Sequence, residues 1–340
     1  MSDDQSHYNV KMEKGVFYKD GSPIFFISGD YPYYRDDPSV WSSKLDAIKN
    51  LGVNVVTCYF PWRHHAIKQE DGKLLYDFVG NTYPSRNVIK FIKLVKEKNM
   101  FLIGKPGPFI HAETNYGGLP DFVNPKENKE IVASKNAWGY SNKWTFMFGT
   151  PLPSPLEEPY LSLVKEYLYK VGESIFKRFI YPEGPIIALQ ILNEGIYSQG
   201  NISLDNFEYS PIASKHFNQF LMKIYNNDIK HYNTVNNTNH DSFKDIFPPK
   251  PKYIKKIKKL NEIRKIIDWG DFATDYYNSV IDTYLEEIHK GSTGKSMKIP
   301  ILINTNPPAN FKQGADTFLI RMVPETMHAN YGYTNWIGVV

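Results

Sequence analysis

Short apolar runs alternate along the chain with longer segments in which apolar residues recur at helical spacing. The run Ile186–Leu192 holds six apolar residues in seven, follows Gly184-Pro185 and ends at Asn193-Glu194-Gly195. A short apolar run between breakers is typical of a strand buried on both faces, as in a parallel sheet covered by helices. Similar runs predict strands at residues 24–28, 53–59, 100–105, 298–304 and 335–340.

Segments with helical periodicity separate these strands and predict an α/β fold. The expected helices cover 38–50, 87–99, 161–179, 211–225, 269–290 and 316–331. Alternating strands and helices indicate parallel βα units. Six such units, with polar loops after the strands, predict a (β/α)8 TIM barrel that is truncated after about six βα units. A doubly wound sheet is the alternative, although no glycine fingerprint for a dinucleotide follows the first strand.

Composition narrows the class of protein. The 340 residues are 41% hydrophobic and 22% charged, which is ordinary for a globular protein, and 15% are aromatic. The net charge of +4 gives no reason to expect a nucleic-acid partner, and the basic run 250–265 is interpreted as a solvated helix face. The single cysteine, Cys58, excludes an internal disulfide. Residues 1–6 lack a secretory signal and no apolar stretch reaches membrane-spanning length, so we expect a cytoplasmic protein without a membrane partner.

Polar and aromatic residues follow most of the predicted strands. They are Asp30, Tyr31, Tyr59, Trp62, His111, Glu113, Asn193, Glu194, Asn304 and Asn306. In a barrel these positions share one mouth. Carboxylates and amides hydrogen-bond hydroxyl groups and aromatic rings stack on sugars, so the set favours carbohydrate, and a glycosidase needs two carboxylates across the scissile bond. The alternative at the fourth strand is that Asn193-Glu194-Gly195 only turns the chain towards solvent.

Four separate blocks of the sequence resemble the family 35 glycoside hydrolases, the β-galactosidases. The blocks are Ser28-Gly29-Asp30-Tyr31-Pro32, Thr57-Cys58-Tyr59-Phe60-Pro61-Trp62, the segment from Gly107-Pro108-Phe109 to Gly118-Leu119-Pro120, and the segment from Gly184 to Glu194. The resemblance covers about residues 15–195. Beyond residue 195 it becomes weaker, and the helical segment with Trp269 is more similar to the family 42 enzymes of the same clan A.

The resemblance implies a retaining glycosidase that acts on terminal β-D-galactosides. Glu194 matches the general acid/base, and Asn193 matches the amide that bonds the sugar 2-hydroxyl. Tyr59 and Glu113 match residues of the galactose-binding pocket, with Ala112 and Asn115 beside them. Residues 15–340 would then be a (β/α)8-type catalytic domain, incomplete at the C-terminus, after a flexible segment at 1–14.

Two departures from the family pattern concern the site. His111 stands where the family often has cysteine; it either tunes Glu113 or donates to a hydroxyl, or it is only a packed loop histidine. The nucleophile of the clan follows the seventh strand, whereas six strands are predicted here. Either the nucleophile lies beyond Val340, or Glu325, just after Pro324, takes its place.

No metal or cofactor is expected, because the pair His64-His65 lacks a third ligand at suitable spacing. The predicted partner is a galactoside or oligosaccharide substrate. A barrel without two of its strands exposes two sheet edges, so we also expect weak solubility or a homo-oligomer. Two other functions remain open: a non-catalytic, vestigial carbohydrate-binding barrel, and a clan A glycosidase with another sugar specificity.

Overall fold

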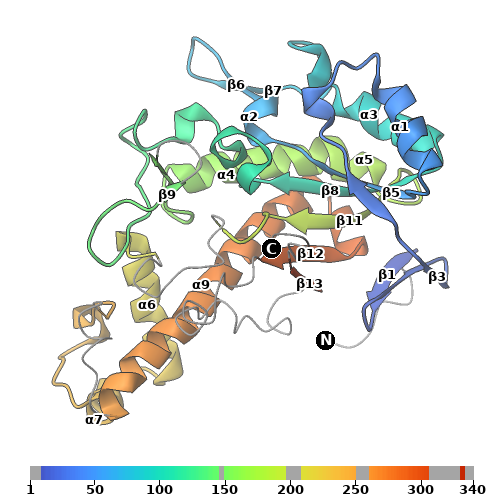
Figure 1. Ribbon diagram of the computed structural model, residues 1–340. Helices are drawn as coiled ribbons and strands as arrows, with labels where there is room; N and C mark the ends of the chain where they lie inside the picture. The colour runs from blue at the N-terminus through green and yellow to red at the C-terminus, as the bar shows by residue number, and fades with distance from the viewer. Residues whose placement is uncertain (1–8, 145–148, 197–207, 250–259, 306–329, 334–340) are drawn as a thin grey trace, which may run out of the picture.

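The computed structural model describes residues 9–144, 149–196, 208–249, 260–305 and 330–333, and its centre is a curled parallel sheet (Figure 1). The six strands are β4 (Ser28–Asp30), β5 (Val55–Tyr59), β8 (Phe101–Gly107), β11 (Ile186–Ile191), β12 (Ile301–Thr305) and β13 (Asn330–Tyr333). Their order across the sheet equals their order along the chain, and every neighbouring pair is parallel. A doubly wound sheet reverses its strand order at a switch point. The sheet therefore winds in one direction, as in a (β/α)8 barrel, and the doubly wound alternative is wrong.

The two faces of the sheet pack against different parts of the chain. Val56 and Cys58 of β5 join the main core, which also holds the buried residues of α1 (Trp41–Asn50), α3 (Val88–Glu97) and α4 (Tyr160–Val171). The alternate residue Val55 joins a smaller cluster with Val10 of the N-terminal hairpin and with other inward-facing strand residues. Because side chains alternate along a strand, Thr57 and Tyr59 share the inner face with Val55. The inner face is the one that carries the polar site.

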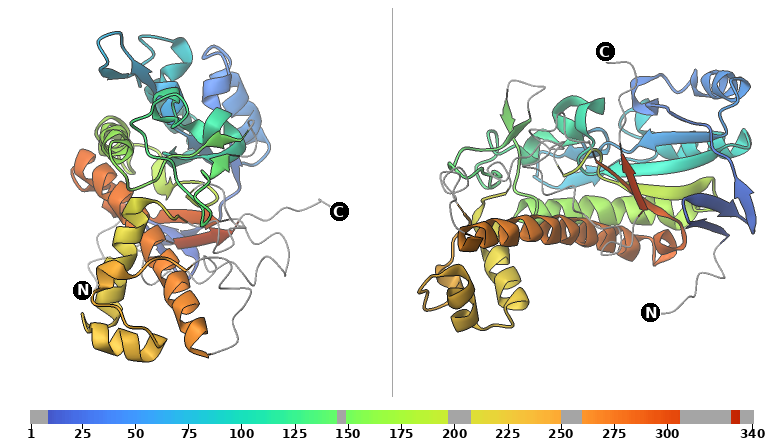
Figure 2. Two further views of the ribbon diagram at one scale, coloured as in Figure 1. Left: turned by 90° about the vertical axis from the view of Figure 1, so that its left-hand side faces the viewer. Right: turned by 60° about the horizontal axis from the view of Figure 1, so that its bottom comes forward.

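Helix α9 (Leu260–Gly291) is the longest helix and packs along α4. In Figure 2 it runs beside the sheet towards α6 (Pro211–Ile224) and α7 (Ile229–Asn236). The close approach to the end of α4 requires two glycines. A Cβ on Gly291 would lie 2.1 Å from the carbonyl oxygen of Tyr169, and one on Gly172 would lie 2.5 Å from that of Ile288.

The remaining helices and strands are short. The strands are β1 (Val10–Glu13), β2 (Val16–Lys19), β3 (Ser22–Ile24), β6 (Ala66–Lys68), β7 (Leu74–Tyr76), β9 (Lys143–Trp144) and β10 (Thr150–Pro151). The helices are α2 (Trp62–His65), α5 (Lys177–Phe179) and the π-turn η7 (Gly172–Phe176), which joins α4 to α5. The 3-10 turns are η2 (Tyr33–Arg35), η3 (Pro84–Arg86), η4 (His111–Glu113), η5 (Asn115–Gly118), η6 (Asp121–Val123), η9 (Phe243–Asp245) and η10 (Lys295–Lys298). Among the described helices, none combines the length and apolar character needed to cross a membrane.

Two predicted strands lie elsewhere in the chain. The first strand is β4 and not residues 24–28; Phe25 is 81% exposed, and the side chain of Asn54 bonds both the Ile27 N–H and the Phe25 carbonyl oxygen. The sixth strand is β13, which pairs with β12 in parallel. Its sequence, Asn-Tyr-Gly-Tyr, contains no apolar run that would predict a buried strand. Residues 335–340, where that strand was predicted, and most of the predicted helix 316–331 lie outside the described residues.

Two segments for which no strand or helix is predicted form regular structure. Val10–Glu13, within the segment predicted to be flexible, pairs with β2. The asparagine-rich segment after residue 226 forms α7, in which Tyr232 and Asn236 are buried. The side chains of Tyr225 and Asn236 bond one another there, so the polar sequence supports local packing.

Candidate active site

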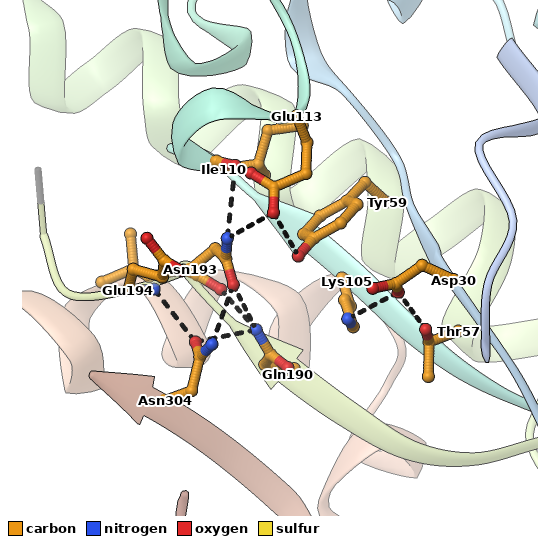
Figure 3. Close-up of polar contacts among 11 residues, drawn as sticks. Asp30, Thr57, Tyr59, Lys105, Ile110, Glu113, Gln190, Asn193, Glu194 and Asn304 are labelled. Carbon is orange, nitrogen blue, oxygen red and sulfur yellow. Dashed lines mark hydrogen bonds and ion pairs between the residues drawn. The ribbon is translucent and has the colours of Figure 1, made fainter. Parts of the chain in front are cut away.

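Polar side chains from five neighbouring strands or the turns after them meet at the carboxyl end of the sheet (Figure 3). Asp30 ends β4, and Thr57 and Tyr59 come from β5. Lys105 lies in β8, which is followed by η4 with His111 and Glu113. Gln190 lies in β11, Asn193 and Glu194 follow it, and Asn304 lies in β12. Because parallel strands end at the same edge, residues distant in sequence form one site here.

Two side-chain amides fix the orientation of Asn193. Its Oδ1 accepts hydrogen bonds from Gln190 Nε2 at 3.1 Å and from Asn304 Nδ2 at 3.0 Å. Its Nδ2 then faces Glu113 Oε1 at 3.2 Å and the Ile110 carbonyl oxygen at 3.4 Å. Asn193 is therefore held on both sides, and its amide nitrogen points into the site.

Glu194 is turned into the molecule rather than towards solvent. Asn193 is 2% exposed and Glu194 is 5% exposed, so the interpretation of this segment as a simple solvent-facing turn is wrong. The Glu194 N–H donates to Asn304 Oδ1 at 3.0 Å, and its Oε2 lies 3.0 Å from His111 Nδ1. Burial lowers the pKa of His111, and the charge of Glu194 opposes this by raising it.

Glu113 is half-buried and has one unused oxygen. Its Oε1 accepts from Tyr59 Oη at 3.4 Å as well as from Asn193. Its Oε2 is buried without a hydrogen-bond partner among the described residues. Burial raises the pKa of Glu113, with the negative charges of Glu194 and Asp30 adding to it. Buried acceptors are normally satisfied, so Oε2 is suited to a hydroxyl group of a ligand.

A pocket of about 320 Å³ opens beside Glu113. Its lining residues are Asp30, Tyr31, Pro32, Tyr34, Arg35, Thr57, Tyr59 and Glu113. Lys105 Nζ lies 2.8 Å from Asp30 Oδ1 and 4.6 Å from the centre of the Tyr59 ring, so it contacts two of the lining residues. Tyr34 and Arg35 donate to the main-chain carbonyl oxygen of Glu113, which ties the loop to the pocket wall.

Only some of the residues that the sequence predicts for the site lie together in the structure. Tyr59, Glu113, Asn193 and Glu194 lie together, whereas Asn115 is exposed in η5. Ala112 lies in η4, but its side chain is outside the described residues, as are Asn306 and Glu325. His111 contacts Glu194. Trp62, expected at the mouth, is instead fully buried and stacks on Tyr167 in the core.

Several site residues were not recognised from the sequence. Gln190 and Lys105 each interrupt an apolar strand, and Thr57 adds a hydroxyl to the inner face of β5. The sequence feature that could have identified them is a single polar residue within a strand whose other residues are apolar. Burial of such a residue requires a hydrogen-bonding partner, so it points to a polar cluster inside the barrel.

The two adjacent histidines do not form a metal site. His65 is fully buried between Tyr33 Oη, at 2.5 Å, and the Asp77 carbonyl oxygen, at 2.6 Å. Burial lowers its pKa to about 3. His64 lies 3.2 Å from Ser85 Oγ. Among the described residues no cluster of three or more His, Cys, Asp and Glu side chains could hold a metal ion.

Comparisons with known proteins agree with this geometry. Residues 16–147 match the family model described as glycosyl hydrolases family 35. A β-1,2-glucosyltransferase from Ignavibacterium album is 32% identical over 85% of the chain, and the match covers 40% of that protein. A β-galactosidase from Bos taurus is 30% identical over 64% of the chain, and the match covers 28% of that protein.

A solved structure shows the same fold. A GH42 β-galactosidase from G. stearothermophilus superposes with a TM-score of 0.60 at 16% identity. The superposition covers 84% of this chain and 36% of the other. The chain thus spans less than half the length of each of these relatives. Residues 16–147 carry the family 35 glycosyl hydrolase signature, and the chain has a barrel-type fold like that of this β-galactosidase.

Proposed function

We propose that the chain forms the acid/base side of a retaining glycosidase site that acts on terminal β-D-galactosides. In this proposal the Glu194 carboxyl gives its proton to the glycosidic oxygen as the bond to the anomeric carbon breaks. The resulting carboxylate later removes a proton from the water that releases the sugar. The observation that carries the proposal is the buried position of Glu194 beside Asn193 at the end of β11.

The neighbouring residues suit the recognition of a sugar ring. The Asn193 amide nitrogen is directed into the site and is assigned to the 2-hydroxyl. The Tyr59 hydroxyl oxygen and the unused Glu113 Oε2 offer acceptors to other hydroxyls of the same ring. The aromatic rings of Tyr31, Tyr34 and Tyr59 line the pocket and provide apolar surface for the CH face of a sugar.

For the nucleophilic carboxylate of this mechanism we have two alternative candidates. A retaining mechanism requires a nucleophile about 5–5.5 Å from the acid/base. Our two candidates are Glu325, which lies outside the described residues, and a carboxylate that follows Val340 in a longer protein. Mass spectrometry after inactivation with a 2-deoxy-2-fluoro galactoside would identify the labelled residue and decide between them.

The test of the function uses a matched pair of variants. Glu194→Gln removes the proton donor at similar volume, whereas Glu70→Gln makes the same change at an exposed position. With 4-nitrophenyl β-galactoside, we expect Glu194→Gln to lower kcat/KM about 10²–10⁴-fold and Glu70→Gln to leave it unchanged. Azide should partly restore turnover of Glu194→Gln on a substrate with a very good leaving group, because azide needs no general base.

Other outcomes support the alternative functions. No turnover by the wild-type chain, together with galactose raising its Tm, would favour a non-catalytic carbohydrate-binding barrel. The similarity to a β-1,2-glucosyltransferase over 85% of the chain favours a second candidate, a β-glucoside as substrate. Turnover of 4-nitrophenyl β-glucoside in preference to the galactoside, with a disaccharide product when glucose is added, would support it.

A further inference from the structure

His111 and Glu194 meet although both have an unusual backbone. His111 has φ 60° and Glu194 has φ 55°, and the two follow different strands, β8 and β11. Non-glycine residues in the left-handed region are uncommon and concentrate where function requires an exact geometry. Here the two left-handed turns bring His111 Nδ1 to 3.0 Å from Glu194 Oε2.

The surroundings of the pair determine which atom holds the proton. His111 is 6% exposed, and burial lowers its pKa below the ordinary value, so the imidazole is neutral near pH 7. A carboxylate can only accept a hydrogen bond, so Nδ1 must carry the hydrogen when Glu194 is charged. Other ionisable groups of the site are Glu113 on the same turn and Asp30, Tyr59 and Lys105 on the neighbouring strands.

We propose that His111 is a positioning residue for Glu194, a role that rests on the acid/base function proposed above. The neutral imidazole donates Nδ1–H to Oε2 and fixes the direction of the carboxyl group. When the proton of Glu194 passes to the leaving oxygen, the carboxylate that forms receives a charge-assisted hydrogen bond, which is stronger than the bond to the neutral acid. His111 thereby favours the transfer step without contacting the substrate itself.

The first experiment measures the pair without any activity assay. In the 340-residue chain labelled with ¹⁵N-histidine, we expect the His111 ring to be the Nδ1–H tautomer at pH 7. Glu194→Gln should lower the pKa of His111 further, because the carboxylate that raises it is gone. The pKa of His289, which is half-buried at the end of α9, serves as the internal control and should not move. An Nε2–H tautomer, or an unchanged His111 pKa in Glu194→Gln, would overturn the pairing.

The second experiment compares two replacements that both tolerate φ 60°. His111→Asn places an amide nitrogen near the position of Nδ1, and His111→Gly removes the donor. We expect His111→Gly to lower kcat about 10–100-fold with little change in KM, as for the loss of one hydrogen bond to a charged group, and His111→Asn to recover much of the loss. The alkaline fall of kcat/KM should move to higher pH in His111→Gly, because the charged carboxylate has lost a donor.

The outcomes separate the two proposals. Equal kcat for His111→Gly and wild type, or an Asn variant as slow as the Gly variant when both melt like wild type, would refute the positioning role. If neither the galactoside nor the glucoside is turned over by the wild-type chain, the proposed function fails and the positioning role fails with it. The tautomer and the response to Glu194→Gln would still decide whether the two residues form a hydrogen-bonded pair.

Discussion

Asn193 Nδ2 donates to Glu113 Oε1 at 3.2 Å, which joins two loops whose residues are 80 positions apart in the sequence. On its other side the same amide receives hydrogen bonds from Gln190 and Asn304. The carboxylate of Glu113 is thus held by a chain of amides that crosses from β8 to β12. Ligand recognition and stability should therefore depend on the same side chain.

Asn193→Ala should lower both stability and affinity for sugar. The substitution leaves the buried amide of Gln190 and the partly buried amide of Asn304 with fewer partners, so we expect the free energy of unfolding to fall by about 1–3 kcal/mol. Galactose binding should weaken, because Glu113 loses one of its two side-chain donors. Denaturant unfolding and a titration with galactose measure the two effects. Asn50→Ala, at an exposed site at the end of α1, is the control, and an equal effect there would contradict the prediction.

The raised pKa of Glu113 predicts a pH-dependent stability. Above pH 4.5 the unfolded chain loses this proton more readily than the folded protein does. The contribution of Glu113 to stability therefore falls as the pH rises from about 4.5 through its folded-state pKa, and it is constant beyond that. Glu113→Gln cannot ionise at this position and does not lose this stability as the pH rises. The free energy of unfolding of the variant minus that of wild type should therefore increase between about pH 4.5 and the folded-state pKa of Glu113. Urea unfolding at several pH values tests this, and a difference that does not change with pH would refute it.

Gly291→Ala should disturb the contact between α9 and the end of α4. The added Cβ would lie 2.1 Å from the Tyr169 carbonyl oxygen, and rigid backbone cannot move aside easily. We expect a loss of about 1–3 kcal/mol in the free energy of unfolding, as for overpacked cores. Gly29→Ala is a suitable control, because a Cβ there meets no atom within 4 Å. A Gly291→Ala variant as stable as the control would show that the two helices can separate without cost.

Local sequence patterns were sufficient for most of the fold. The runs at β5, β8, β11 and β12 predicted buried parallel strands, because strands covered on both faces are apolar along their whole length. They also located Tyr59, Glu113, Asn193 and Glu194 after strand ends, and the topology brings all four to one mouth. The first and sixth strands were misplaced, since β4 and β13 are stabilised by pairing with a neighbour and lack an apolar run of their own.

Contacts between distant residues were decided only by the tertiary structure. The sequence identified His111 as a departure from the family pattern but left its partner open, and the turns after β8 and β11 direct it to Glu194. Likewise, nothing in the local sequence predicts that Lys105 pairs with Asp30 or that Gln190 bonds Asn193. Periodicity reports which face of a strand is buried, because burial is a property of each segment. A hydrogen bond across the barrel depends on register and backbone direction in two segments at once, and only the assembled sheet sets both.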